Sequence, residues 1–147
     1  MSMKLFTIGV SKKSAESFFD LLKKNNIKKI IDIRLNNKSQ LLGFSKEEDL
    51  KYFCEKCHSI EYAHEPLLAP TKEILEQYRK TKDWSIYEAE FNRTIELRSI
   101  IDIFKKIIGD TKNICLLCSE ESSKKCHRRL VAEYIAKRQK EIEVVHL

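Results

Sequence analysis

The sequence predicts an α/β fold in three layers, in which a mainly parallel sheet of about five strands lies between helices on both faces. Short apolar segments alternate with longer segments whose apolar residues recur every three or four positions. The short segments show little polar alternation, as expected of strands that are buried on both sides. Such an alternation predicts right-handed strand-helix-strand units. We expect a single α/β domain over residues 1–147.

The first half of the chain predicts three strands, at 4–8, 29–33 and 60–64. A helix over about 14–25 precedes the second strand, with Phe18, Phe19 and Leu22 on one face.

A second helix follows the irregular stretch 36–45. Ser45 and Glu48 have the spacing of a capping box, which predicts a helix to about Cys57.

The second half predicts a helix over 72–80 and a long helix over 86–108, opened by a capping box of Ser85 and Glu88. Gly109 is expected to end the long helix. We then expect a strand over 113–118, a polar loop over 119–125, a helix to about 140 and a last strand over 143–146. The expected core is Phe18, Phe19, Leu22, Ile31, Ile33, Ile101, Phe104, Leu116, Leu130 and Tyr134.

Composition excludes several classes of protein. The chain has 147 residues, of which 42% are hydrophobic and 34% charged, so it has enough apolar side chains for a core. Three glycines and two prolines exclude collagen-like and low-complexity proteins. The longest apolar run, residues 114–118, is far shorter than the roughly 20 residues of a membrane-spanning helix. We expect a cytoplasmic protein without a membrane partner and without a secretory signal.

Charge and cysteine content add two expectations. The net charge is +6, with Lys and Arg in excess at both ends of the chain and acidic residues in excess in the middle. This excess is modest, and lysine pairs on a solvated surface account for much of it. Five cysteines, an odd number without dense spacing, predict reduced thiols.

The loop after the fourth predicted strand holds the most reactive side chains. Cys118 and Glu120 stand at its start, and Cys126, His127 and Arg128 stand near the beginning of the last helix. A helix N-terminus binds anions and stabilises a thiolate, so Cys126 is expected to be the more reactive thiol. The two cysteines fit three interpretations: nucleophile and resolving thiol, metal ligands, or buried packing residues.

Other strand ends are expected to meet this loop, because ligands bind beyond the carboxyl ends of parallel strands. Asp32 and Arg34 follow the second strand, and the carboxylate is expected to pair with the guanidinium. His64 ends the third strand.

Two polar residues follow the first strand. Ser11 and Lys12 come after a turn at Gly9 and are expected to contact an anion.

A second cysteine group consists of Cys54, Cys57 and His58, which share one face of a helix. A structural zinc site requires four ligands in tetrahedral array, and Cys115 and Cys118 do not complete one because they point to opposite faces of a strand. Packing in the core is favoured for this group. We expect no bound metal and no cofactor.

The predicted loops hold a set of motifs: Thr7-Ile8-Gly9-Val10-Ser11, Ile31-Asp32-Ile33-Arg34 with Ser39 and Gly43-Phe44, Tyr62-Ala63-His64, Leu116-Leu117-Cys118-Ser119-Glu120, Cys126-His127-Arg128 and Val145-His146-Leu147. Taken together, these motifs resemble those of the domain-of-unknown-function 488 family nearly from end to end. The family implies a small α/β protein and the same site, without an established activity. Three positions depart from its pattern: Val10 replaces a common histidine, Asn37 a common proline, and Leu68-Ala69 a common Leu-Gly-Gly-like turn.

The leading functional hypothesis is an enzyme acting on an anionic substrate such as a nucleotide, a nucleic acid or a phosphorylated metabolite. In it Cys118 or Cys126 is the nucleophile, while His127 and Glu120 move protons. Arg34 and Arg128 hold the anion.

The enzyme hypothesis includes two further candidate residues, and two other functions compete with it. Asp32 and His64 are the remaining catalytic candidates. One rival is a non-enzymatic nucleotide or nucleic-acid binding module, disfavoured for single strands because few aromatic residues fall in these loops. The other is a thiol redox protein, which requires Cys118 and Cys126 within about 7 Å between Cα atoms.

Overall fold

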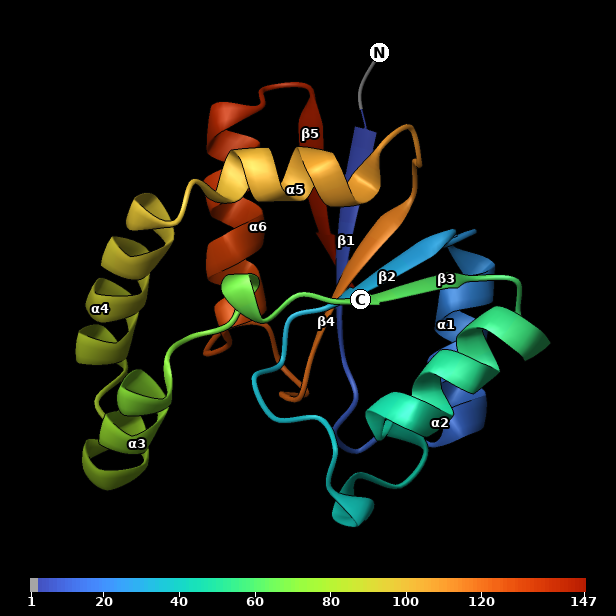
Figure 1. Cartoon of the computed structure of the whole chain (residues 1–147), viewed down its shortest axis with the longest axis horizontal. Helices are drawn as coiled ribbons and strands as arrows, with labels where there is room; N and C mark the ends of the chain where they lie inside the picture. Colours follow the sequence, from blue (N-terminus) through green and yellow to red (C-terminus); the bar gives the residue numbers. More distant parts are fainter. Residues whose placement is uncertain (1–2) are drawn as a thin grey trace.

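A computed structural model of the chain describes residues 3–147 and contains one five-stranded sheet. All neighbouring strands are parallel, in the order β3-β2-β4-β1-β5 (Figure 1). The strands are β1 (Met3–Gly9), β2 (Lys29–Asp32), β3 (Glu61–His64), β4 (Ile114–Cys118) and β5 (Ile142–His146). The predicted fold class is therefore confirmed, and the sheet is entirely parallel.

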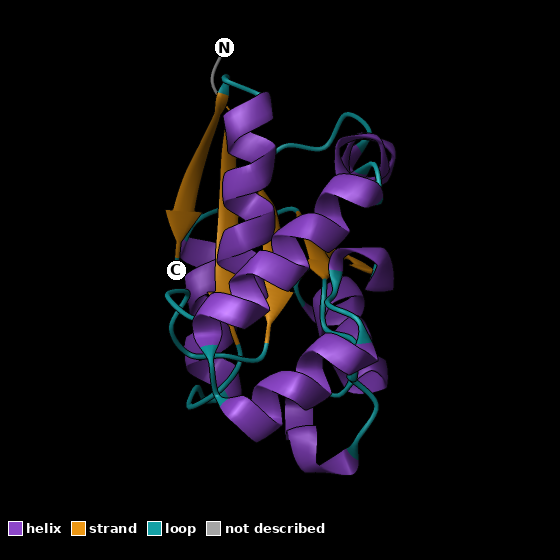
Figure 2. Cartoon of the chain, turned by 90° about the vertical axis from the view of Figure 1, so that its left-hand side faces the viewer, coloured by secondary structure: helices purple, strands orange, loops and turns teal. Residues whose placement is uncertain are grey.

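Helices cover both faces of the sheet. Helices α1 (Ala15–Lys24) and α2 (Glu47–Tyr52) lie on one face. The opposite face is covered by α5 (Ile100–Ile108) and α6 (His127–Arg138), with α4 (Trp84–Leu97) packed against α6 and α3 (Lys72–Thr81) packed against α4. Figure 2 shows the second group in front of the strands. Shorter helical turns occupy Gln40–Ser45, Phe53–Cys57 and Pro66–Leu68.

Alternation along each strand divides the core in two. In β4, Leu116 faces α4, α5 and α6, while Leu117 faces α1 and α2. Burial of both faces explains why the strands are apolar throughout. Of the ten predicted core residues, only Ile101 and Tyr134 are half-buried rather than buried.

The predicted long helix over 86–108 is wrong, since two helices occupy this region. Ser99 has a left-handed backbone with φ 53° and separates α4 from α5. The break lets α5 run across the sheet and bury Ile100 and Phe104. Leu97, inside the predicted helix, is 81% exposed at the end of α4. Periodicity does not detect such a break, because apolar residues continue on both sides of it.

Both predicted capping boxes are also wrong. Helix α2 has Lys46 at its N-cap, without a side-chain cap, and the Ser45 hydroxyl donates instead to the carbonyl of Leu42. Helix α4 starts one residue before Ser85, with Asp83 as its N-cap accepting from the amide of Ile86. In each case a neighbouring residue takes the cap position that spacing assigned to serine.

The topology leaves a crevice at the carboxyl end of β4. Strand β4 lies between β1 and β2. The chain leaves β1 and β2 for helices on one face of the sheet, and leaves β4 for α6 on the other face. Ligands of parallel α/β proteins bind where neighbouring strands connect to opposite faces in this way. Within residues 3–147, no helix has both the length and the apolarity needed to cross a membrane.

Candidate functional site

A cavity of about 690 Å³ lies beyond the carboxyl ends of β2 and β4. Cys118, Cys126 and His127 line it from the sheet side, and helices α3 and α4 supply the opposite wall. The full lining is Arg34, Leu35, Asn36, Pro70, Leu75, Tyr78, Arg79, Lys82, Trp84, Tyr87, Cys118, Ser119, Glu120, Lys125, Cys126 and His127.

Arg128 fixes the loop between β4 and α6 from inside the protein. Its side chain is buried, with Nε donating to Thr7 Oγ1 at 3.1 Å and Nη1 donating to Cys118 Sγ at 3.2 Å. The same guanidinium donates to the carbonyl oxygens of Glu120 and Glu121. One buried cation thus ties β1, the end of β4 and the following loop together, which sets the position of Cys118.

Gly9 allows this loop to approach β1. A Cβ atom at Gly9 would overlap the carbonyl oxygen of Glu120 and lie 2.7 Å from Nη1 of Arg128. Backbone hydrogen bonds from Val10 to Cys118 and from Ser11 to Ser119 continue the contact. Glycine is needed here because no other residue leaves room for the loop.

Cys118, Cys126 and His127 form a compact group at one end of the cavity. The two sulfur atoms lie within disulfide-bonding distance, contrary to the expectation that all thiols are reduced, while the Cα atoms are 7.6 Å apart. One ligand-capable atom from each of the three residues lies within 4.8 Å of the others. Cys126 is the N-cap of α6.

His127 is held as a neutral imidazole. Its Nε2 donates to the carbonyl oxygen of Ile33 at 2.6 Å, which leaves Nδ1 without a proton. Burial lowers the pKa of His127 to about 4, against the opposing effect of the hydrogen bond to Ile33, and nearby Arg128 lowers it further. At neutral pH the ring therefore offers a lone pair and no charge.

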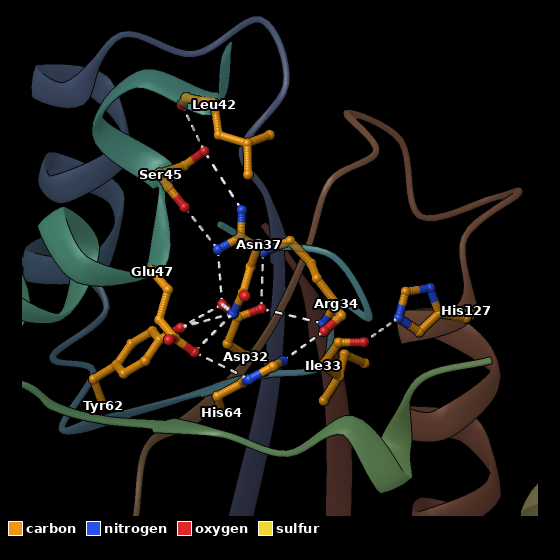
Figure 3. Close-up of polar contacts among 10 residues, drawn as sticks. All are labelled: Asp32, Ile33, Arg34, Asn37, Leu42, Ser45, Glu47, Tyr62, His64 and His127. Carbon is orange, nitrogen blue, oxygen red and sulfur yellow. Dashed lines mark hydrogen bonds and ion pairs between the residues drawn. The ribbon is translucent and has the colours of Figure 1, made fainter. Parts of the chain in front are cut away.

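A second polar network surrounds Asp32 and Arg34 (Figure 3). The carboxylate accepts from Nε and Nη2 of Arg34 at 2.8 and 2.7 Å, and the guanidinium also donates to Ser45. Asn37 Nδ2 and the Tyr62 hydroxyl donate to the same carboxylate. Burial alone would raise the pKa of Asp32, but the bonds and charge of Arg34 outweigh it, and the pKa is lowered. The predicted pairing of Asp32 with Arg34 is present.

His64 connects this network to α2. Its Nε2 donates to the carbonyl oxygen of Arg34 at 2.7 Å, and its Nδ1 lies 3.1 Å from Oε2 of Glu47. Since His127 binds the carbonyl of Ile33, two histidines from distant elements hold consecutive carbonyls at the end of β2 (Figure 3). Their positions suit a role in fixing the backbone beside the cavity.

The structure separates the ten predicted site residues into two groups. Cavity-lining residues are Arg34, Cys118, Glu120, Cys126 and His127, whereas Asp32, His64, Arg128, Ser11 and Lys12 lie outside the lining. The guanidinium groups of Arg34 and Arg128 are both buried and bound to protein acceptors. Lys12 forms an exposed ion pair with Glu121 at 3.4 Å. Contact of these residues with an anion remains a prediction.

Sequence reasoning missed the wall that α3 and α4 contribute. Tyr78, Trp84 and Tyr87 form an aromatic cluster there, with ring centroids 4.8 to 5.9 Å apart. Arg79 and Lys82 are exposed beside the cluster. The sequence did show three aromatic residues within ten positions around the turn between two helices. No local sequence pattern indicated that this turn faces the carboxyl ends of the strands.

The alternative cysteine group remains apart. Cys54 is buried in the core, Cys57 is exposed, and the His58 ring stacks on Phe19 at 4.3 Å between centroids. Among residues 3–147, the only set of three or more such ligands that comes together within 4.8 Å is the one at Cys118, Cys126 and His127.

One comparison with known proteins gives a match. The family described as "Domain of unknown function DUF488" matches residues 14–135. This range contains Cys118, Cys126, His127 and Arg128, and it confirms the resemblance drawn from the motifs. No curated protein and no solved structure matches the chain.

Proposed function

The chain belongs to the DUF488 family, and from its site we propose that it is an enzyme acting on a small substrate of the nucleotide class, with a planar ring and an anionic group. One observation carries the proposal. A single cavity combines an aromatic wall, exposed cations and the buried group Cys118, Cys126 and His127. Enclosed pockets that bring together apolar walls and a few polar groups are where substrates bind.

The aromatic wall is suited to a planar ring. Trp84 and Tyr87 stack on each other at 21°, and Tyr78 lies edge-on to Trp84. All three line the cavity. Stacking of a base on an aromatic side chain contributes about 1 to 3 kcal/mol, enough to orient a nucleobase.

The cations on the rim are suited to a phosphate. Arg79, Lys82 and Lys125 are exposed at the cavity, and no carboxylate within residues 3–147 forms an ion pair with any of them. Guanidinium and ammonium groups bind phosphate through charge-assisted hydrogen bonds. These residues take the anion-binding role in the proposal, because the donors of Arg34 and Arg128 already serve protein acceptors.

The chemistry of the proposed enzyme centres on Cys118, Cys126 and His127, with Glu120 on the cavity wall as a group for proton transfer. A dithiol-disulfide function is less favoured. The Cα separation of 7.6 Å exceeds the 4.4 to 6.8 Å that disulfides usually span.

Binding and turnover test the proposal separately. Calorimetry with AMP, adenosine and ribose 5-phosphate should show the tightest binding for AMP, since only AMP has both ring and anion. Tyr78→Ala and Lys82→Ala should each weaken AMP binding by roughly tenfold. Tyr52→Ala and Lys51→Ala, at exposed positions of α2, are the matched controls.

Two results would overturn the proposal. Equal binding of AMP by all four variants, or no binding at all, would exclude the nucleotide class. Conversion is followed by chromatography over a panel of nucleoside mono- and diphosphates. Binding of nucleotides without any conversion would favour the binding module. Conversion that disappears in Cys126→Ser while AMP still binds would support the enzyme.

A further inference from the structure

We infer that Cys118, Cys126 and His127 bind one divalent transition-metal ion, best matched by zinc, with a fourth coordination position open to the cavity. The three residues lie on two elements and meet only through the fold: Cys118 ends β4, and Cys126 and His127 begin α6. The inference concerns the site of the proposed function and adds a cofactor to it. It does not depend on the identity of the substrate.

The donor atoms lie close enough together to share one tetrahedral ion once the two sulfurs move apart. They lie within 4.8 Å of one another. Ligands at about 2.3 Å for sulfur and about 2.0 to 2.1 Å for nitrogen are roughly 3.5 to 3.8 Å apart around zinc. Side-chain adjustments of about 1 Å bring the three donors to this spacing without a change in the fold.

The backbone spacing of the cysteines favours an ion between the sulfurs over a direct bond. Cα atoms of disulfide-bonded cysteines are usually 4.4 to 6.8 Å apart. In this protein the two Cα atoms are 7.6 Å apart, and the two side chains point toward each other. A metal ion replaces one sulfur–sulfur bond with two longer sulfur–metal bonds, which suits the larger separation.

A hydrogen bond to the backbone orients His127 as a ligand. Its Nε2 donates to the Ile33 carbonyl, which orients the ring and leaves Nδ1 as the free donor (Figure 3). Histidine ligands of metals almost always donate their other ring N–H to a carbonyl or carboxylate in this manner. The hydrogen bond thus has the form expected beside a metal ion.

The charges around the thiols favour thiolates. Arg128 Nη1 lies 3.2 Å from Cys118 Sγ, and Cys126 occupies the N-terminus of α6, where the helix dipole stabilises negative charge. Two thiolates and a neutral imidazole balance a doubly charged cation. The Arg128 guanidinium also donates hydrogen bonds to the carbonyl oxygens of Glu120 and Glu121.

The donor set is that of an open site. Zinc sites with two cysteines and one histidine keep a fourth position for water or substrate in catalytic proteins. All three proposed ligands line the cavity, as does Glu120. The fourth position therefore faces the space in which the substrate is proposed to bind, and zinc there lowers the pKa of a bound water.

Cobalt substitution tests the inference. Reduced protein, freed of metal by a chelator, is titrated with Co²⁺ and then with Zn²⁺. We expect one Co²⁺ per chain, with thiolate-to-cobalt charge-transfer absorption and tetrahedral d–d bands, both lost when Zn²⁺ displaces the cobalt. Cys126→Ser should weaken Co²⁺ binding by at least the roughly tenfold that loss of an outer-shell partner costs. Serine is a good N-cap, so this variant should fold.

Matched controls come from the other cysteine group. Cys57→Ser and His58→Gln, both exposed, should leave the cobalt spectrum and stoichiometry unchanged. His127→Gln should also weaken Co²⁺ binding, and circular dichroism checks that both variants remain folded.

Three results would overturn the inference: no thiolate-cobalt absorption in the parent protein, an unchanged spectrum in Cys126→Ser, or loss of the spectrum in Cys57→Ser. The last would move the metal to the group at Cys54. Absence of metal would also support the expectation of no bound metal drawn from the sequence. AMP binding is measured on the same metal-free protein, so a failure of the metal site is distinguished from a failure of the nucleotide site.

Discussion

Replacement of Gly9 by alanine is expected to disrupt the loop that positions Cys118. The added Cβ would overlap the carbonyl oxygen of Glu120 and approach Arg128, so the loop has to move away from β1. Overpacking costs about 1 to 3 kcal/mol, and loss of the Arg128 hydrogen bond to that carbonyl costs about 1.5 to 3 kcal/mol. Reduced entropy of the unfolded chain returns up to about 1 kcal/mol. We expect a net loss of about 2 to 5 kcal/mol.

Thermal unfolding followed by circular dichroism measures this loss. For a chain of this size, 1 kcal/mol shifts Tm by about 2 to 4 °C, so Gly9→Ala should lower Tm by about 4 to 20 °C. Gly109→Ala is the control for backbone strain alone, because its Cβ has no neighbour within 4 Å and only its φ of 53° with ψ of −124° opposes the change, at about 1 to 3 kcal/mol. A Tm for Gly9→Ala equal to that of the parent would refute the steric reasoning.

Three further predictions concern stability. Asp32→Asn should destabilise the protein by about 3 to 5 kcal/mol at neutral pH, because Arg34 loses its buried partner. Since the pKa of Asp32 is lowered in the folded state, the pair contributes fully above the unfolded value of about 3.9 and is lost as pH falls through the folded pKa. In urea titrations the difference from the parent should shrink in acid, and a constant difference would contradict this. Ser99→Gly should raise Tm by a few degrees, because glycine adopts its φ of 53° without strain and the serine side chain caps nothing. Leu97→Lys should leave stability within about 0.5 kcal/mol, as expected of an exposed position.

The fold was largely predictable because its signals are local. All five predicted strands are present, and the alternation of strands with helices correctly indicated a parallel sheet. The break at Ser99 was not predictable, since an unfavourable backbone conformation there is offset by tertiary packing of Ile100 and Phe104. The capping boxes failed for a related reason, because Lys46 and Asp83 take positions that local spacing assigned to serines.

The candidate site was predictable only in part. The rule that ligands bind at strand ends led to Cys118, Cys126 and His127, which line the cavity. The same rule could not tell which arginines face outward. Arg34 and Arg128 follow strands or begin a helix as a ligand-binding residue would, yet each finds its acceptors inside the protein. Trp84 escaped prediction because its place at the cavity depends on the packing of α3 and α4, which leaves no local pattern.

The position of β1 has a consequence for synthesis of the chain. This strand pairs with β4 on one side and β5 on the other, and these are the last two strands to be translated. While residues before Ile114 emerge from the ribosome, β1 has neither neighbour, and both of its edges are open to other chains. Pairing between such distant segments is slow. The cavity is therefore assembled only after β4 and α6 have been translated.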